Sequence, residues 1–206
     1  MRSPALAIAW ELCRRHRWVP GAWTGYVLLV VAWKLLVAGP GSTLALDPPD
    51  GMAVVVITPS LALFLTLLAA FSYGFDGALI GRRSLYPARM LTLPLSNGAL
   101  AGWPMLWGAL AMGALWLTTA LLGRLTWSYH LPLIWPALYT ASFLCWTQVL
   151  AWLPYGVRGL RVIATVLWLS TTNVFVVVAV YFELPEPLLA AFLVPQFPLA
   201  FLCARA

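Results

Sequence analysis

Six long apolar stretches, almost free of charge, constrain the fold of this chain more than any other feature. A helix needs about 20 apolar residues to cross a bilayer core about 30 Å thick. Runs close to that length, bounded by charges or by Gly and Pro turns, cover residues 20–38, 52–75, 100–123, 133–153, 162–182 and 188–203. Pro195 and Pro198 interrupt the last one. We therefore expect an all-α integral membrane protein with a single transmembrane domain over residues 1–206. This domain should contain six transmembrane helices, of which the sixth is kinked or crosses the membrane only in part.

Composition excludes the soluble classes of protein. Hydrophobic residues make up 63% of the chain and charged residues 9%, against about 25% charged in a typical soluble domain. So much apolar surface is stable only in hydrocarbon, which makes the lipid bilayer a partner. No nucleic-acid partner is expected, because phosphate recognition needs clustered Lys and Arg on a wet surface.

The distribution of cations predicts how the chain crosses the membrane. With a cytoplasmic N-terminus, Arg124 alone falls in an outer loop and Lys34 near the outer end of the first span. All other cations fall inside: Arg2, Arg14, Arg15, Arg17, Arg82, Arg83, Arg89, Arg158, Arg161 and Arg205. Because positive charge marks cytoplasmic loops, we predict a multi-pass protein of a bacterial plasma (inner) membrane with both termini cytoplasmic.

Residues 1–19 precede the first span and have two interpretations. Leu6, Trp10 and Cys13 share one helical face, with Glu11 and Arg15 opposite. That pattern is typical of a short interfacial helix on the inner leaflet. The alternative is a plain basic leader.

No reactive constellation points to an enzyme. His16 and His130 lie outside the spans, and the sequence contains no HExxH, GxSxG or paired intramembrane carboxylates. The only lysine, Lys34, follows Trp33 rather than Gly, so no phosphate-binding loop is present. We predict no catalytic residue, metal or cofactor on this chain, and any nucleotide chemistry would come from a partner.

Polar residues within the spans have two interpretations. Thr66, Gln148 and Asn173 are examples. Such side chains commonly make interhelical hydrogen bonds. The alternative is that these three residues line a possible substrate path.

The connection between the second and third stretches is unlike an inert loop. Pro87 and Pro94 break it into short pieces. Among its three arginines lie the apolar residues Leu85, Tyr86, Met90, Leu91, Leu93 and Leu95. Exposed apolar residues usually mark a docking surface, and a short helix over Tyr86 to Leu93 would fit the groove of a partner. The alternative is a second amphipathic segment lying on the bilayer.

This loop resembles that of the membrane (permease) subunits of type-2 ABC exporters. The matching residues are Tyr86-Pro87-Ala88-Arg89 and Leu91-Thr92-Leu93-Pro94-Leu95-Ser96, with Ala99-Leu100 opening the next helix. The resemblance implies an N-terminal interfacial helix, six spans and a short cytoplasmic coupling helix between spans two and three. It implies that the residues that couple to an ATPase subunit are Tyr86, Pro87, Arg89, Met90, Leu91, Leu93, Pro94, Leu95 and Ser96.

The resemblance also implies partners. They are cytoplasmic ABC ATPase subunits, which carry ATP and Mg²⁺, and a second permease copy or a related permease. This chain would then form the transmembrane pathway of an ATP-driven exporter without hydrolysing ATP itself. The alternative is a substrate-capturing or scaffolding membrane subunit of another transport complex. A substrate-capturing subunit would need a pocket with convergent polar groups on the outer side of the membrane.

Overall fold

The computed structural model describes residues 4–36, 53–72, 84, 86, 95–127, 131–155, 157 and 159–205. Within these residues all regular secondary structure is helical, and turns and short irregular segments connect the helices. The expectation of an all-α protein is confirmed for this part of the chain. The helices are α1 (Pro4–Arg15), α2 (Trp18–Leu36), α4 (Thr58–Phe71) with a preceding π-helical turn η1 (Ala53–Ile57), α6 (Asn97–Trp127), α7 (Ile134–Trp152), α8 (Leu160–Tyr181), α9 (Glu186–Leu193) and α10 (Gln196–Arg205).

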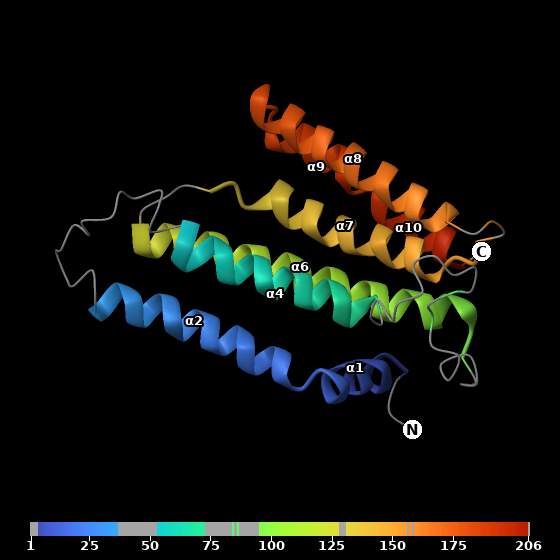
Figure 1. Cartoon of the computed structure of the whole chain (residues 1–206), viewed down its shortest axis with the longest axis horizontal. Helices are drawn as coiled ribbons and strands as arrows, with labels where there is room; N and C mark the ends of the chain where they lie inside the picture. The colour runs from blue at the N-terminus through green and yellow to red at the C-terminus, as the bar shows by residue number, and fades with distance from the viewer. Residues whose placement is uncertain are drawn as a thin grey trace.

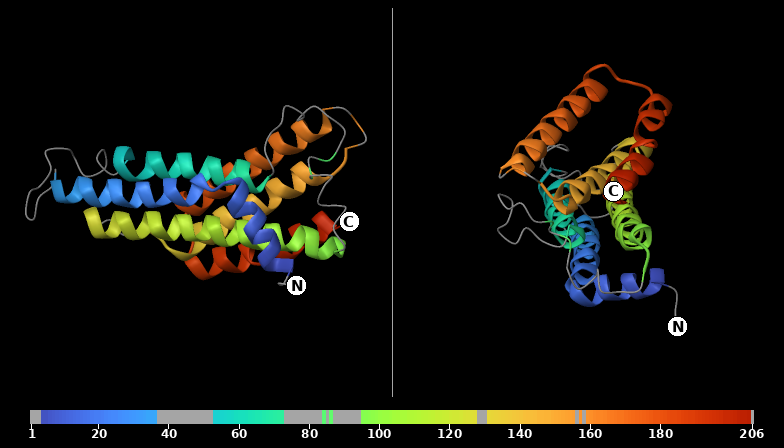
Figure 2. Two further views of the ribbon diagram at one scale, coloured as in Figure 1. Left: turned by 90° about the horizontal axis from the view of Figure 1, so that it is seen from below. Right: turned by 90° about the vertical axis from the view of Figure 1, so that its right-hand side faces the viewer.

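Successive helices from α2 onward run in alternating directions along one long axis, with α9 and α10 forming the last leg (Figure 1). The short helix α1 turns crosswise to that axis (Figure 2). One end of the bundle, here called the α1 end, therefore holds α1, the α7–α8 connection and the last residues of α10. Arg14 of α1, Arg17 in the turn between α1 and α2, and Arg205 in the last turn of α10 are exposed and belong to this end. Arg124 lies in the last turn of α6, which ends at the opposite end of the bundle (Figure 1). These cations divide between the two ends as the sequence predicted.

Within the described residues, three helices are long and apolar enough to cross a membrane. They cover Asn97–Thr126, Leu160–Tyr181 and Glu186–Arg205. The last combines α9 and α10, which are separated by a turn at Val194 and Pro195, in agreement with the predicted interruption. The other predicted spans correspond to shorter helices, α2, α4 and α7.

The ends of two helices differ from the predicted ranges. Helix α6 is 31 residues long, and it begins before residue 100 and continues past Arg124. The guanidinium of Arg124 is exposed, so its charge does not end the helix. Helix α4 ends at Phe71, short of the predicted residue 75, because Ser72 already adopts a turn conformation with φ −80° and ψ 2°.

Two clusters of buried side chains hold the helices together. One lies among α2, η1, α4, α6 and α7 and includes Val30, Val56, Leu67, Met112 and Leu144. The other lies at the α1 end, is called here the α1-end core, and consists of Ile8, Leu12, Leu100, Ala101, Met105, Cys145, Val149, Ala151, Trp152 and Ala200. The second cluster positions the candidate site.

Helix α1 does not bury the face of Leu6, Trp10 and Cys13 that the sequence pattern indicated as apolar. Ile8 and Leu12 are buried in the α1-end core against α6. Leu6 and Trp10 are 56% and 71% exposed. The helix therefore has two apolar faces, one packed against the bundle and one that faces away from it, where a bilayer interface would cover it.

Candidate coupling site

The start of α6 gives a physical reason for the last two residues of the Leu-Pro-Leu-Ser pattern, Leu95 and Ser96. Ser96 lies immediately before the helix, and its Oγ accepts a hydrogen bond from the N–H of Ala99 at 3.3 Å. This is the N-cap arrangement, in which a serine side chain satisfies one of the N–H groups that a first turn leaves without a partner. Leu95 packs, half-buried, against the α1-end core. These two predicted residues thus fix the point where the loop enters α6.

Tyr86 ties the predicted coupling loop to α6. Its hydroxyl donates a 2.9 Å hydrogen bond to the backbone carbonyl of Leu100. In a regular helix that carbonyl would accept from the N–H four residues later, but Pro104 stands there and has no N–H. Tyr86 therefore satisfies a carbonyl that the proline leaves free.

The ring of Tyr86 is held as firmly as its hydroxyl. It packs edge-to-face against Trp152 at the end of α7, with 5.1 Å between the ring centroids. Its backbone N–H donates to the Oγ of Ser84 at 3.1 Å. Burial raises the pKa of Tyr86 to about 12. The hydroxyl therefore stays protonated at neutral pH and remains a hydrogen-bond donor.

Gln148 joins three helices within one turn of the same proline. Its side chain is fully buried, and its Nε2 donates to the carbonyl of Phe71 at 3.1 Å and to that of Pro104 at 3.4 Å. Phe71 is the last residue of α4, whose carbonyls lack helical partners. Gln148 thus connects the end of α4, the proline turn of α6 and the body of α7.

The three helices also pack closely at Gly108. A Cβ at this position would lie 2.5 Å from Cδ2 of Leu144 and 3.2 Å from the ring of Phe71. A side chain here would therefore force neighbouring groups to move. Sequence reasoning singled out neither Gly108 nor Pro104, although a proline and a glycine four residues apart inside an apolar stretch are a recognisable signal of a special contact.

Arg161 is a second residue whose role the sequence did not indicate. It was predicted only as an inside cation, yet it is 1% exposed at the first turn of α8. Its Nη2 donates to the carbonyl of Leu153 at 3.2 Å, and its guanidinium lies 5.1 Å from the ring centroid of Tyr155. Burial raises the pKa of Tyr155, and the nearby Arg161 charge opposes that shift. Arg161 therefore fastens the α7–α8 connection to the bundle.

Several predicted coupling residues lie outside the described residues. They are Pro87, Arg89, Met90, Leu91, Leu93 and Pro94. The helix expected over Tyr86 to Leu93 stays a prediction. Of the predicted set, Tyr86, Leu95 and Ser96 are described, and all three lie where the loop meets α6.

The three residues of the possible substrate path lie on different helices. Thr66 on α4 donates from its hydroxyl to the Ala62 carbonyl at 2.8 Å. Gln148 on α7 makes the interhelical bonds described above, which is the other interpretation that its sequence position allowed. Asn173 on α8 is exposed and donates to the Leu169 carbonyl at 2.8 Å. Their role in a path stays a prediction.

The described residues contain no group of three or more His, Cys, Asp or Glu side chains placed to hold a metal ion. Comparison of the chain with models of protein families, with curated proteins and with solved structures finds no match. The function proposed below therefore depends on the contacts of Tyr86 and its neighbours and on the resemblance of the loop sequence.

Proposed function

We propose that this chain is the permease subunit of an ATP-driven ABC exporter of a bacterial inner membrane. In this proposal the chain crosses the membrane six times with both termini cytoplasmic, so that the α1 end faces the cytoplasm. It pairs with a second permease copy or a related permease and with separate ATPase subunits that bind ATP and Mg²⁺. The observation that carries the proposal is the hydrogen bond from Tyr86 to Leu100 beside Pro104.

This bond suits transmission of force from the loop to the helices. An ATPase that docks on residues 87–94 would pull or push on Tyr86, which contacts α6 through Leu100 and α7 through Trp152. Helix α6 lacks one internal hydrogen bond at this turn because of Pro104, so the turn bends more easily than its neighbours. Gln148 would pass the movement to α4. ATP biases the permease only if these contacts differ in energy between the two ATPase states.

The outward face of α8 supports the pairing with a second permease. Trp168, Thr172 and Phe175 face the bundle, since they contact or are buried among its other helices. Ser170 and Asn173, near the middle of the helix, lie on the opposite, exposed face. Polar groups at mid-membrane depth are costly against lipid and usually face a partner helix or a water-filled path. In the proposed exporter this face borders the transport pathway between the two permeases.

Co-purification tests the proposal directly. The tagged chain is isolated in a mild detergent from its native membranes, and its partners are identified by mass spectrometry. A Leu91→Asp/Leu93→Asp variant should insert normally but lose the ATPase subunit, because the charges fall on the proposed docking surface. Phe182→Asp is the matched control, since Phe182 is 64% exposed in the turn at the opposite end of the bundle. This control should retain the ATPase.

Two results would overturn the proposal. One is recovery of no ATPase under conditions that preserve other membrane complexes, which would favour a substrate-capturing or scaffolding subunit. The other is equal recovery of the ATPase with Leu91→Asp/Leu93→Asp and with the wild type. The isolated chain, for its part, should show no ATPase activity.

A further inference from the structure

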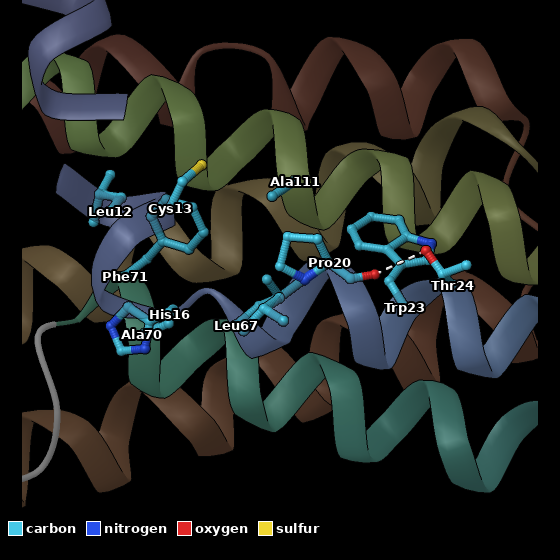
Figure 3. A pocket seen from close by; sticks show the side chains of 11 residues that line it. Leu12, Cys13, His16, Pro20, Trp23, Thr24, Leu67, Ala70, Phe71 and Ala111 are labelled. Atoms are coloured by element: carbon cyan, nitrogen blue, oxygen red, sulfur yellow. Dashed lines mark hydrogen bonds between the residues drawn. The ribbon is translucent and has the colours of Figure 1, made fainter. Parts of the chain in front are cut away.

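A groove beside the crossing of α1 and α2 shares only Phe71 with the contacts of the proposed coupling site. Its walls come from α1, α2, α4 and α6, and its volume is about 350 Å³ (Figure 3). Leu67, Ala70 and Phe71 of α4, Ala111 of α6, Leu12 of α1 and Trp23 of α2 line it. This volume is within the range of ligand sites, which is about 300–1,000 Å³.

The lining of the groove suits a hydrocarbon chain rather than water or a peptide. Leucine, alanine and aromatic side chains dominate it. The hydroxyl of Thr24, one of its few polar groups, already donates to the Pro20 carbonyl at 2.9 Å. A peptide segment would bring N–H and C=O groups that need partners in an apolar site. An acyl chain needs none.

The surroundings of the groove place it at the boundary between headgroups and acyl chains. The exposed face of α1 carries Trp10, and tryptophan is enriched at this depth of a membrane. Where α1 turns into α2, the N–H of Val19 donates to the His16 carbonyl at 2.9 Å, and His16 lines the groove. Arg14 and Arg17 flank His16 in the chain and are exposed.

We propose that this groove binds one acyl chain of an anionic phospholipid whose headgroup phosphate lies against Arg14 and Arg17. Charge complementarity selects the lipid class, because Arg14 and Arg17 are exposed and Glu11 is the only acidic residue in the described parts of α1 and α2. The lipid would fill the space between α1 and α4, and so hold the interfacial helix against the bundle. This inference needs only a membrane-embedded chain and does not rest on the proposed exporter function.

Native mass spectrometry of the purified full chain tests the proposal. Palmitoyl-oleoyl phosphatidylglycerol is titrated against phosphatidylcholine with the same acyl chains. The wild type should bind phosphatidylglycerol about tenfold more tightly or better, since each arginine near an anionic headgroup contributes appreciably. Arg14→Gln/Arg17→Gln should remove most of this preference. Arg205→Gln, which removes an exposed charge at the same end of the bundle, should leave it unchanged.

A second pair of variants tests the groove itself. Ala111→Phe would fill it and should weaken binding of both lipids about tenfold. The matched control is Ala114→Phe, on an exposed position of the same helix, which should bind as the wild type does. Should Ala111→Phe fail to fold, phosphatidylglycerol with a photoreactive acyl chain can be crosslinked to the wild type. The labelled peptides should then contain Trp23 or Leu67.

Three outcomes would overturn the proposal. They are equal affinity for the two lipids, equal lipid binding by Ala111→Phe and Ala114→Phe, and photolabelling confined to other helices. Association of two copies that Ala111→Phe abolishes would likewise overturn it, because the groove would then hold protein. Loss of ATPase recovery would not affect it, so the two proposals fail separately.

Discussion

The hydrogen bond between Tyr86 and Leu100 makes a quantitative prediction about Pro104. Tyr86→Phe keeps the ring that packs on Trp152 but removes the donor to the Leu100 carbonyl. Leu100 is 4% exposed, so water reaches its carbonyl poorly. Leaving a buried acceptor without a partner costs about 1–3 kcal/mol. We expect Tyr86→Phe to lower the free energy of unfolding by about this amount.

The effect should depend on residue 104. In Pro104→Ala, residue 104 regains an N–H, which points along the helix to the Leu100 carbonyl. The carbonyl then no longer depends on Tyr86, and Tyr86→Phe should cost close to nothing in this background. The double-mutant cycle should therefore yield a coupling energy of about 1–3 kcal/mol between Tyr86 and Pro104. Pro104→Ala alone should not destabilise α6, because an interior proline costs about 3 kcal/mol relative to alanine.

The assay is equilibrium unfolding in mixed micelles of dodecyl maltoside and dodecyl sulfate, followed by tryptophan fluorescence. Tyr155→Phe is the matched control. Its hydroxyl makes no hydrogen bond within the part of the chain that the structure describes, so its removal should cost little in either background. A Tyr86→Phe cost that is the same with proline and with alanine at residue 104, within about 0.5 kcal/mol, would refute the reasoning.

Three further predictions concern the same region. Burial raises the pKa of Tyr86 from 10.0 to about 12. The stabilisation that the Tyr86 hydroxyl provides is therefore present below pH 10 and is lost as the pH rises through 12. The melting temperature of Tyr86→Phe should fall less between these pH values than that of the wild type. Gly108→Ala should lower the melting temperature, because the new Cβ would lie too close to Leu144 and Phe71. A Cβ at Gly113 would have its nearest neighbouring atom 3.9 Å away, so Gly113→Ala should raise stability by up to about 1 kcal/mol. The opposite order of the two variants would contradict the packing described. Gln148→Leu should cost about 1–3 kcal/mol in the same unfolding assay, because two carbonyls lose a donor, and a neutral effect would mean that Gln148 does not hold the helices together.

The local features of this protein were predictable from its sequence. Helices occur in all six apolar stretches, because the length and apolarity of a run are properties of neighbouring residues. The interruption before α10 follows from Pro195, and the start of α6 follows from Ser96, whose capping bond reaches only three residues along the chain. Among the described arginines, the placement of Arg14, Arg17 and Arg205 at one end and of Arg124 at the other was equally readable, since it needs only the order of loops.

The contacts that make the candidate site were decided by tertiary structure. Tyr86 contacts Leu100 across 14 residues, and Gln148 contacts Phe71 across 77 residues. No periodicity relates such positions, so the pattern that places Gln148 on α7 leaves both of its sequence interpretations open. Helix α1 offers two apolar faces, and only the position of α6 decides that Ile8 and Leu12 are the buried ones. In the same way Arg161 reads as a solvent-exposed loop cation until the Leu153 carbonyl and the Tyr155 ring surround it. Local sequence thus determines which segments become helices. The carbonyls without a helical partner, such as those of Leu100 and Phe71, find hydrogen-bond donors only when the bundle assembles.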